Sequence, residues 1–88
     1  MKFYYTYALF SHKDKKFYTG WTVDLIKRVK KHLSGQVYST KNRLPLELFY
    51  YEACRNEQDA RAREKFLKSG MGKRFLRNRV KNFLSPPS

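Results

Sequence analysis

Acidic residues and cysteines are scarce in this chain of 88 residues. Only seven Asp and Glu stand against twenty Lys and Arg, so the formal net charge is +13 with histidine neutral. Charge of one sign at this density repels itself and indicates an anionic partner. A single cysteine, Cys54, excludes an internal disulfide framework and a zinc site built from cysteines.

Long apolar runs are also missing. No stretch approaches the length of about 18 residues that a membrane-spanning helix needs, and the first ten residues lack the apolar core and cleavage site of a secretory signal. We therefore expect a soluble, cytoplasmic protein without a membrane partner. Aromatic residues, in contrast, make up 17% of the chain. A disordered basic tail would be poor in them, so a folded domain is predicted.

Three segments have the composition of β-strands. Residues 3–11 and 17–22 are rich in aromatic and β-branched residues, and the five polar residues between them are typical of a hairpin loop. Gly20 lies inside the second strand, which indicates a bulge or a close backbone approach. Residues 46–53 are expected to form a third strand, preceded by a loop over 36–45.

The segment after the hairpin has the marks of a helix. Thr22 is its expected N-cap, and Leu25, Val29 and Leu33 recur at four-residue intervals as its core stripe. Basic residues and His32 are expected to fill its other faces.

Two further helices are predicted after the third strand. One spans residues 57–69, with Asn56 as its N-cap and Gly70 as its stop. The other spans residues 72–84, with apolar residues on one face and Lys and Arg on the other. The order is β-β-α-β-α-α, which predicts an α+β fold with a small three-stranded antiparallel sheet flanked by helices.

A few side chains in these elements have suggestive chemistry. Arg28 and His32 are spaced i, i+4 on one helix face, where a guanidinium could neutralise a phosphate and an imidazole could move a proton. Glu64 lies among basic residues, and one carboxylate is sufficient to hold Mg²⁺ together with waters and phosphate oxygens. From spacing alone, a solvated basic face and surface ion pairing are the simpler interpretations.

Tyrosines crowd the predicted hairpin. Most aromatic residues on strands belong to the core. A phenol close to several cations would instead have a lowered pKa and could take a proton from water. The residues concerned are Tyr4, Tyr5, Tyr7 and Tyr18.

Taken singly these signals are weak, but their order along the chain is specific. They resemble the GIY-YIG nuclease superfamily, and within it the small stand-alone members related to the N-terminal nuclease domain of UvrC. The resemblance covers residues 3–83 and predicts one domain over 1–84, followed by a short tail at 85–88. The matching elements are Tyr5-Thr6-Tyr7, Tyr18-Thr19-Gly20, Arg28 with His32 one turn later, and Glu64.

The resemblance implies a role for each matched residue. Tyr7 and Tyr18 are the tyrosines of the two half-motifs, and either one is the implied general base. Arg28 is implied to neutralise the phosphate, and His32 to orient the tyrosine or water or to relay a proton. Glu64 is the implied metal ligand. These five residues are the expected catalytic set.

One further site residue and several departures accompany the match. An asparagine late in the chain is found at many sites of the superfamily, and here Asn78 or Asn82 fills that position. The first half-motif has Tyr5 and Thr6 where the family has glycine and isoleucine. Thr19 replaces the isoleucine of the second half-motif, and Leu33 a frequent asparagine. All five residues of the expected reacting set are nevertheless present.

The implied activity is that of a DNA endonuclease. Phosphodiester hydrolysis would follow a one-metal mechanism with Mg²⁺ or Mn²⁺ and a tyrosine general base, in DNA repair or recombination. A single domain with no specificity module is expected to prefer structured or damaged DNA over a particular sequence, or to be targeted by a protein partner. The cations expected to track the DNA backbone are Lys27, Lys30, Lys31, Lys41, Arg43, Lys73, Arg74 and Arg77.

A non-catalytic DNA- or RNA-binding module is the main alternative. Its binding would depend steeply on salt and be indifferent to metal. An RNA-recognition motif has a different strand order and a sequence pattern that is absent here. Adsorption of a basic amphipathic helix to an anionic membrane would leave Arg28, His32 and Glu64 unexplained.

Overall fold

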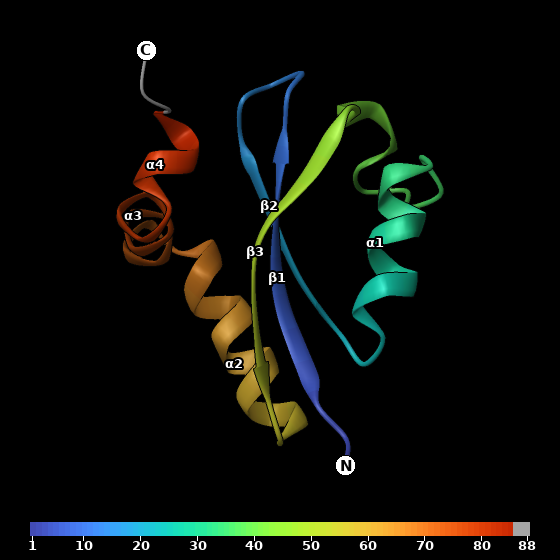
Figure 1. The fold of residues 1–88 in the computed structure, drawn as a ribbon, viewed down its shortest axis with the longest axis vertical. Helices are drawn as coiled ribbons and strands as arrows, with labels where there is room; N and C mark the ends of the chain where they lie inside the picture. The colour runs from blue at the N-terminus through green and yellow to red at the C-terminus, as the bar shows by residue number, and fades with distance from the viewer. Residues whose placement is uncertain (86–88) are drawn as a thin grey trace.

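The computed structural model describes residues 1–85 and contains one antiparallel sheet (Figure 1). Its strands are β1 (Tyr4–Ser11), β2 (Phe17–Thr22) and β3 (Leu46–Cys54), in the order β2-β1-β3. The long, aromatic β1 is therefore the central strand and β2 is an edge. The predicted hairpin and third strand are confirmed, and Tyr7 of β1 pairs with Gly20 of β2.

Helices cover both faces of the sheet, so the molecule has three layers. The helix after the hairpin lies on one face, and the last three helices lie together on the other (Figure 1). Among residues 1–85, no helix is both long and apolar enough to cross a membrane. The α+β class and the β-β-α-β-α-α order are confirmed, except that the last predicted helix is two. The helical elements are α1 (Leu25–Leu33), the short 3-10 helix η1 (Lys41–Arg43), α2 (Glu57–Lys68), α3 (Gly70–Arg79) and α4 (Lys81–Leu84).

Alternation along β1 gives the protein two small cores. Tyr7 and Leu9 point to the α1 side and pack with Leu46. Ala8 points to the opposite side and packs with residues of α2 and α3. Because successive side chains of a strand face opposite ways, the order of residues along β1 decides which side chains face α1 and which face α2 and α3.

The N-terminus and the buried face of α1 differ from the sequence expectation. Asp24, not Thr22, is the N-cap, and its carboxylate accepts a hydrogen bond from the Lys27 backbone N–H at 3.1 Å. Thr22 is the last residue of β2, so it cannot also begin the helix. Leu33 was expected in the core stripe but is 46% exposed, whereas His32 is fully buried. The helix is rotated so that the imidazole, not the leucine, meets the sheet.

The junction of α2 and α3 also differs. Asn56 caps α2 as predicted, but Gly70 begins α3 instead of ending a helix. Ser69 is the N-cap of α3 at this junction, because its hydroxyl accepts a hydrogen bond from the Gly72 N–H at 3.1 Å. The helix expected over 72–84 is interrupted at Val80, whose φ of −119° and ψ of 33° are not helical. Beyond Ser85, the tail predicted at 85–88 lies outside the described residues.

Candidate active site

A buried hydrogen-bonded chain connects β1, α1 and the loop before η1. The Tyr7 hydroxyl lies 2.8 Å from His32 Nε2, and His32 Nδ1 lies 2.8 Å from Thr40 Oγ1. All three residues are at most 1% exposed. Both ring nitrogens of the imidazole therefore have a partner, and the ring is held in one orientation.

Gly20 makes room for this arrangement on the edge strand. A Cβ atom at Gly20 would lie 2.5 Å from the Tyr7 hydroxyl oxygen and 2.7 Å from the adjacent ring carbon. Any larger residue would displace the phenol from His32. The close backbone approach predicted for Gly20 is confirmed, and it is an approach to Tyr7.

The surroundings keep His32 neutral. Burial lowers its pKa to about 4, and the positive charge of Arg28 acts in the same direction. Near neutral pH the ring therefore has one N–H and one free lone pair. In one of the two neutral tautomers the Tyr7 O–H donates to Nε2 and the Nδ1–H donates to Thr40 Oγ1.

Tyr7 does not have the lowered pKa that a phenol among cations was expected to have. Burial is the largest influence and raises its pKa, and the nearby Tyr18 and Glu64 raise it further. Arg28 has the opposite effect but does not outweigh burial. Burial therefore outweighs the nearby positive charge at this phenol, in agreement with the assignment of most strand aromatics to the core.

Tyr18 lies at the more accessible side of the same cluster. Its ring is 5.1 Å from the His32 ring, and the Ser39 hydroxyl donates to its oxygen at 3.3 Å. Tyr18 is half-buried, in contrast to Tyr7. The two tyrosines of the half-motifs therefore contact one histidine from two neighbouring strands.

Glu64 lies on α2, close enough for its charge to act on Tyr7. Its side chain is 21% exposed and pairs with Lys68 at 3.2 Å. Within residues 1–85 no group of three or more His, Cys, Asp or Glu residues is placed to hold a metal. A single carboxylate fits a hard cation such as Mg²⁺, which keeps waters and binds substrate phosphate oxygens. The residues present are thus compatible with one weakly held divalent ion.

The structure brings together all five residues of the expected catalytic set, although α1 and α2 lie on opposite faces of the sheet. It does not do so for the two candidate asparagines. Asn78 in α3 and Asn82 in α4 are both exposed, and the hydrogen bonds among the described residues join neither of them to this cluster.

The predicted backbone-tracking cations do not form one continuous face. Lys27, Lys30 and Lys31 lie on α1, whereas Lys73, Arg74 and Arg77 lie on α3, across the sheet (Figure 1). Lys41 and Arg43 are in η1. Two separate basic surfaces therefore exist.

Sequence reasoning missed Thr40 and Ser39. Both lie in a segment predicted only as a loop, where no periodicity distinguishes one polar residue from the next. Thr40 is fully buried because its hydroxyl is the second partner of His32. Only the path of the loop over α1 reveals that role.

The chain is similar to known proteins over most of its length. Residues 3–78 match the family model described as the GIY-YIG catalytic domain. A UPF0213 protein of Clostridium perfringens is 42% identical over 65 residues, which cover 73% of this chain and 69% of that protein. One of Pediococcus acidilactici is 39% identical over 77 residues, covering 84% and 78%.

A solved structure is similar as well. The solution NMR structure of a UPF0213 protein from Bacillus halodurans superimposes with a TM-score of 0.55 at 33% identity, covering 89% of this chain and 85% of that one. The names of these relatives state no activity. The family match nevertheless spans both tyrosine half-motifs, Arg28, His32 and Glu64. The chain therefore belongs to the GIY-YIG family, a superfamily of nucleases, together with the small UPF0213 proteins.

Proposed function

We propose that this protein is a DNA endonuclease that hydrolyses phosphodiester bonds with one divalent ion, Mg²⁺ or Mn²⁺. The observation that carries the proposal is the Tyr7–His32 contact of 2.8 Å, with the charges of Arg28 and Glu64 acting on the same phenol. A proton acceptor, a cation and a metal-binding carboxylate around one hydroxyl are the groups that phosphodiester hydrolysis needs.

Glu64 would hold the metal ion. When bound, the ion polarises the scissile phosphate and stabilises the leaving 3′ oxygen. Lys68 pairs with the same carboxylate and offsets its charge. Because the pair is partly solvent-exposed and joins residues one turn apart, it contributes little stability and opposes metal binding weakly.

Tyr7 is the general base in this proposal, in preference to Tyr18. Its oxygen accepts a proton from the attacking water while its own proton passes to Nε2 of His32, at 2.8 Å. The water oxygen bonds to phosphorus, the bond from phosphorus to the 3′ oxygen breaks, and the leaving oxygen takes a proton from solvent. The low pKa of His32 makes its protonation transient, so the proton returns to solvent after each turnover.

Arg28 neutralises the charge that grows on the phosphate. It is half-buried, and a fixed guanidinium acts more strongly where water is partly excluded. Its position near Tyr7 also opposes the rise in the phenol pKa that burial causes. One side chain thus favours both the anionic substrate and the deprotonated base.

Structured or damaged DNA is the proposed substrate, in repair or recombination. The cations of this chain suit phosphates, which carry no sequence information. Recognition would then follow the shape of the DNA, or come from a protein partner that targets the nuclease.

The test is cleavage of a panel of plasmid, duplex, single-stranded, flap and branched DNA with Mg²⁺, Mn²⁺ or EDTA. Glu64→Gln is compared with Glu57→Gln, because both glutamates lie on α2 and pair with a cation one turn later. We expect metal-dependent cleavage that Glu64→Gln loses by at least about a hundredfold and Glu57→Gln retains. Equal cleavage by both variants would contradict the proposal. Metal-independent binding without cleavage would support the non-catalytic binding module instead.

A further inference from the structure

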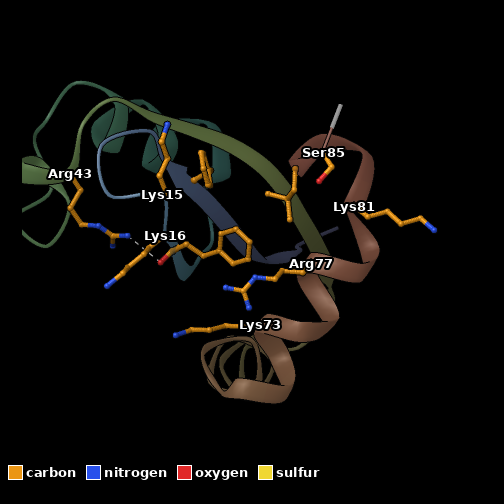
Figure 2. Close-up of a pocket in the computed structure, with 10 residues that line it drawn as sticks. Lys15, Lys16, Arg43, Lys73, Arg77, Lys81 and Ser85 are labelled. Atoms are coloured by element: carbon orange, nitrogen blue, oxygen red, sulfur yellow. Dashed lines mark hydrogen bonds between the residues drawn. The ribbon is translucent and has the colours of Figure 1, made fainter. Parts of the chain in front are cut away.

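A concave site lies between the hairpin loop and the α3–α4 pair (Figure 2). We call it the basic cleft. Its volume is about 700 Å³, and no acidic residue lines it. The lining residues are Phe10, Lys15, Lys16, Phe17, Arg43, Lys73, Arg77, Lys81, Leu84 and Ser85.

One of the six cations that line the basic cleft already forms an ion pair that stabilises the fold. Arg43 pairs with Asp14 through Nε at 2.6 Å and donates to the Phe17 carbonyl at 3.3 Å. The pairing holds the pKa of the Asp14 carboxyl at about 2. Arg43 therefore ties η1 to the hairpin and brings little free charge to the cleft.

The other five cations have no such partner. Within residues 1–85 none of them forms an ion pair, and they line one concavity from three elements, the hairpin loop, α3 and α4. Placing them together costs repulsive energy in the free protein. A bound polyanion removes that cost. The five are Lys15, Lys16, Lys73, Arg77 and Lys81.

Lys15 adds a backbone observation. Its φ is +61°, in the left-handed region where Gly and Asn are favoured in hairpin loops. A lysine there costs on the order of 1 kcal/mol, which a loop built for stability alone would avoid. The conformation turns the loop so that two consecutive lysines reach the cleft.

The floor of the basic cleft is apolar. Phe10, Phe17 and Leu84 line it, and the Arg77 guanidinium lies over the Phe17 ring at 5.5 Å. Cations around aromatic and aliphatic side chains match a nucleotide chain, whose phosphates are anionic and whose bases and sugars have apolar faces. A flat membrane surface would meet only the rim of a concave site, whereas a nucleic-acid strand can enter it.

The basic cleft is separate from the active site. Phe17 packs with the core on the α2–α3 side, whereas its neighbour Tyr18 packs with Tyr7 on the α1 side. Phe17 of the basic cleft and Tyr18 of the candidate active site thus face opposite sides of β2. Because β2 is an edge strand, no further strand separates them, and a nucleic-acid strand can pass around this edge from one to the other.

We propose that the basic cleft binds the phosphodiester backbone of a nucleic-acid strand away from the scissile bond. It anchors the substrate and takes no part in the chemistry. The anchoring role rests on the proposed nuclease function, but binding by the cleft does not, so the two can fail separately.

Binding is measured by fluorescence anisotropy with single-stranded and duplex DNA, in a Glu64→Gln background that does not cleave. Lys73→Gln/Arg77→Gln is compared with Lys2→Gln/Arg79→Gln, which removes the same charge outside the cleft. Lys16→Gln/Lys81→Gln is a second cleft variant that leaves the Arg77–Phe17 contact intact. Thermal unfolding verifies that each variant is folded.

We expect each cleft variant to bind about tenfold more weakly at about 0.1 M salt, and the slope of log K against log salt to fall by about 1.4–1.8, for two lost phosphate contacts. The control should change affinity less than about threefold. The DNA form that shows the larger loss identifies whether the cleft holds a single strand or a duplex backbone.

Equal loss in cleft and control variants would overturn the proposal, since total charge would then explain binding. Unchanged DNA affinity in both cleft variants would also overturn the proposal. Binding of the protein to anionic phospholipid vesicles in place of DNA would overturn it as well. If the cleft variants weaken binding but the wild-type protein cleaves no DNA, the cleft stands and the nuclease proposal fails.

Discussion

His32 is a fully buried imidazole in a strongly basic protein, and its neighbours decide its charge. Burial and Arg28 both disfavour the imidazolium form. Thr40 and Tyr7 occupy its two nitrogens, so protonation would force one hydrogen bond to be rearranged. A neutral ring keeps one nitrogen lone pair available to the Tyr7 hydroxyl, which the role proposed above requires.

Stability should depend on pH through His32. The folded pKa of about 4 lies below the ordinary value of 6.5, so between these values the unfolded chain binds a proton that the folded one does not. The free energy of unfolding should therefore fall as pH decreases from 6.5 to 4, by on the order of 3 kcal/mol. Below pH 4 this contribution should not change further.

Denaturant unfolding across this pH range measures the effect. Carboxylates also titrate near its lower end, so the comparison is between variants: His32→Gln should show a shallower dependence, and His12→Gln, which alters an exposed histidine, should match the wild type. An unchanged pH dependence in His32→Gln would contradict a buried neutral imidazole.

The two tyrosines of the site should not be equivalent. Tyr7→Phe removes the hydroxyl that lies 2.8 Å from His32, and we expect the cleavage rate to fall about 10²–10⁴-fold. Tyr18→Phe leaves that contact intact and should cost less than about tenfold. Single-turnover cleavage at saturating protein separates rate from affinity. A larger loss in Tyr18→Phe would assign the base to Tyr18 instead.

At the scale of elements, the turn between α2 and α3 places the last helices against the sheet. A Cβ atom at Gly72 would collide with the Phe66 carbonyl and the Leu67 backbone. Both are backbone atoms and cannot move aside as a side chain can. Gly72 is therefore required where α3 crosses the end of α2, which in turn places Leu76 in the core.

Substituting the two glycines of α3 should have opposite effects. Gly72→Ala should lower the free energy of unfolding by at least about 1–3 kcal/mol, because it overpacks a backbone contact. Gly70→Ala meets nothing within 4 Å and should raise stability by about 0.4–1 kcal/mol, since alanine restricts the unfolded chain. Urea unfolding of both variants is the measurement. Wild-type stability in Gly72→Ala would show that α3 can move away at no cost.

At the scale of the whole molecule, the net charge of +13 acts against folding and in favour of binding. Each acidic residue that forms an ion pair in residues 1–85 does so at a partly or fully exposed site, where such pairs contribute little. The unpaired cations repel one another across a protein whose Cα radius of gyration is 12.9 Å. That distance is comparable to the screening length of about 10 Å at 0.1 M salt.

Salt should therefore have opposite effects on stability and on DNA affinity. Raising sodium chloride from about 20 mM to about 200 mM shortens the screening length and should raise the Tm of the free protein. A gain of about 1 kcal/mol would appear as about 4–8 °C for a domain of this size. The same change should weaken DNA binding steeply. A Tm that falls with salt would show that ion pairs outweigh the repulsion.

The sequence alone determined the fold class and the family, and it predicted five site residues that the structure places close together. Strand composition, the polar hairpin loop and the spacing of Arg28 and His32 are local features. They can therefore be recognised directly from the order of residues along the chain. The order of the motifs then identified the superfamily, because motif order survives when single positions such as Tyr5 and Thr6 have changed.

Only the tertiary structure decided what surrounds those residues. The rotation of α1 buried His32 and exposed Leu33, because the imidazole had partners in Tyr7 and Thr40, 25 and 8 residues away in sequence. Burial raised the pKa of Tyr7, although the neighbouring Arg28 acts to lower it. The placement of α1 and α3 on opposite faces of the sheet divided the predicted cations between two separate surfaces. The burial of His32, the raised pKa of Tyr7 and the grouping of the cations all arise from contacts between segments that are distant in the sequence. No local sequence pattern predicts them.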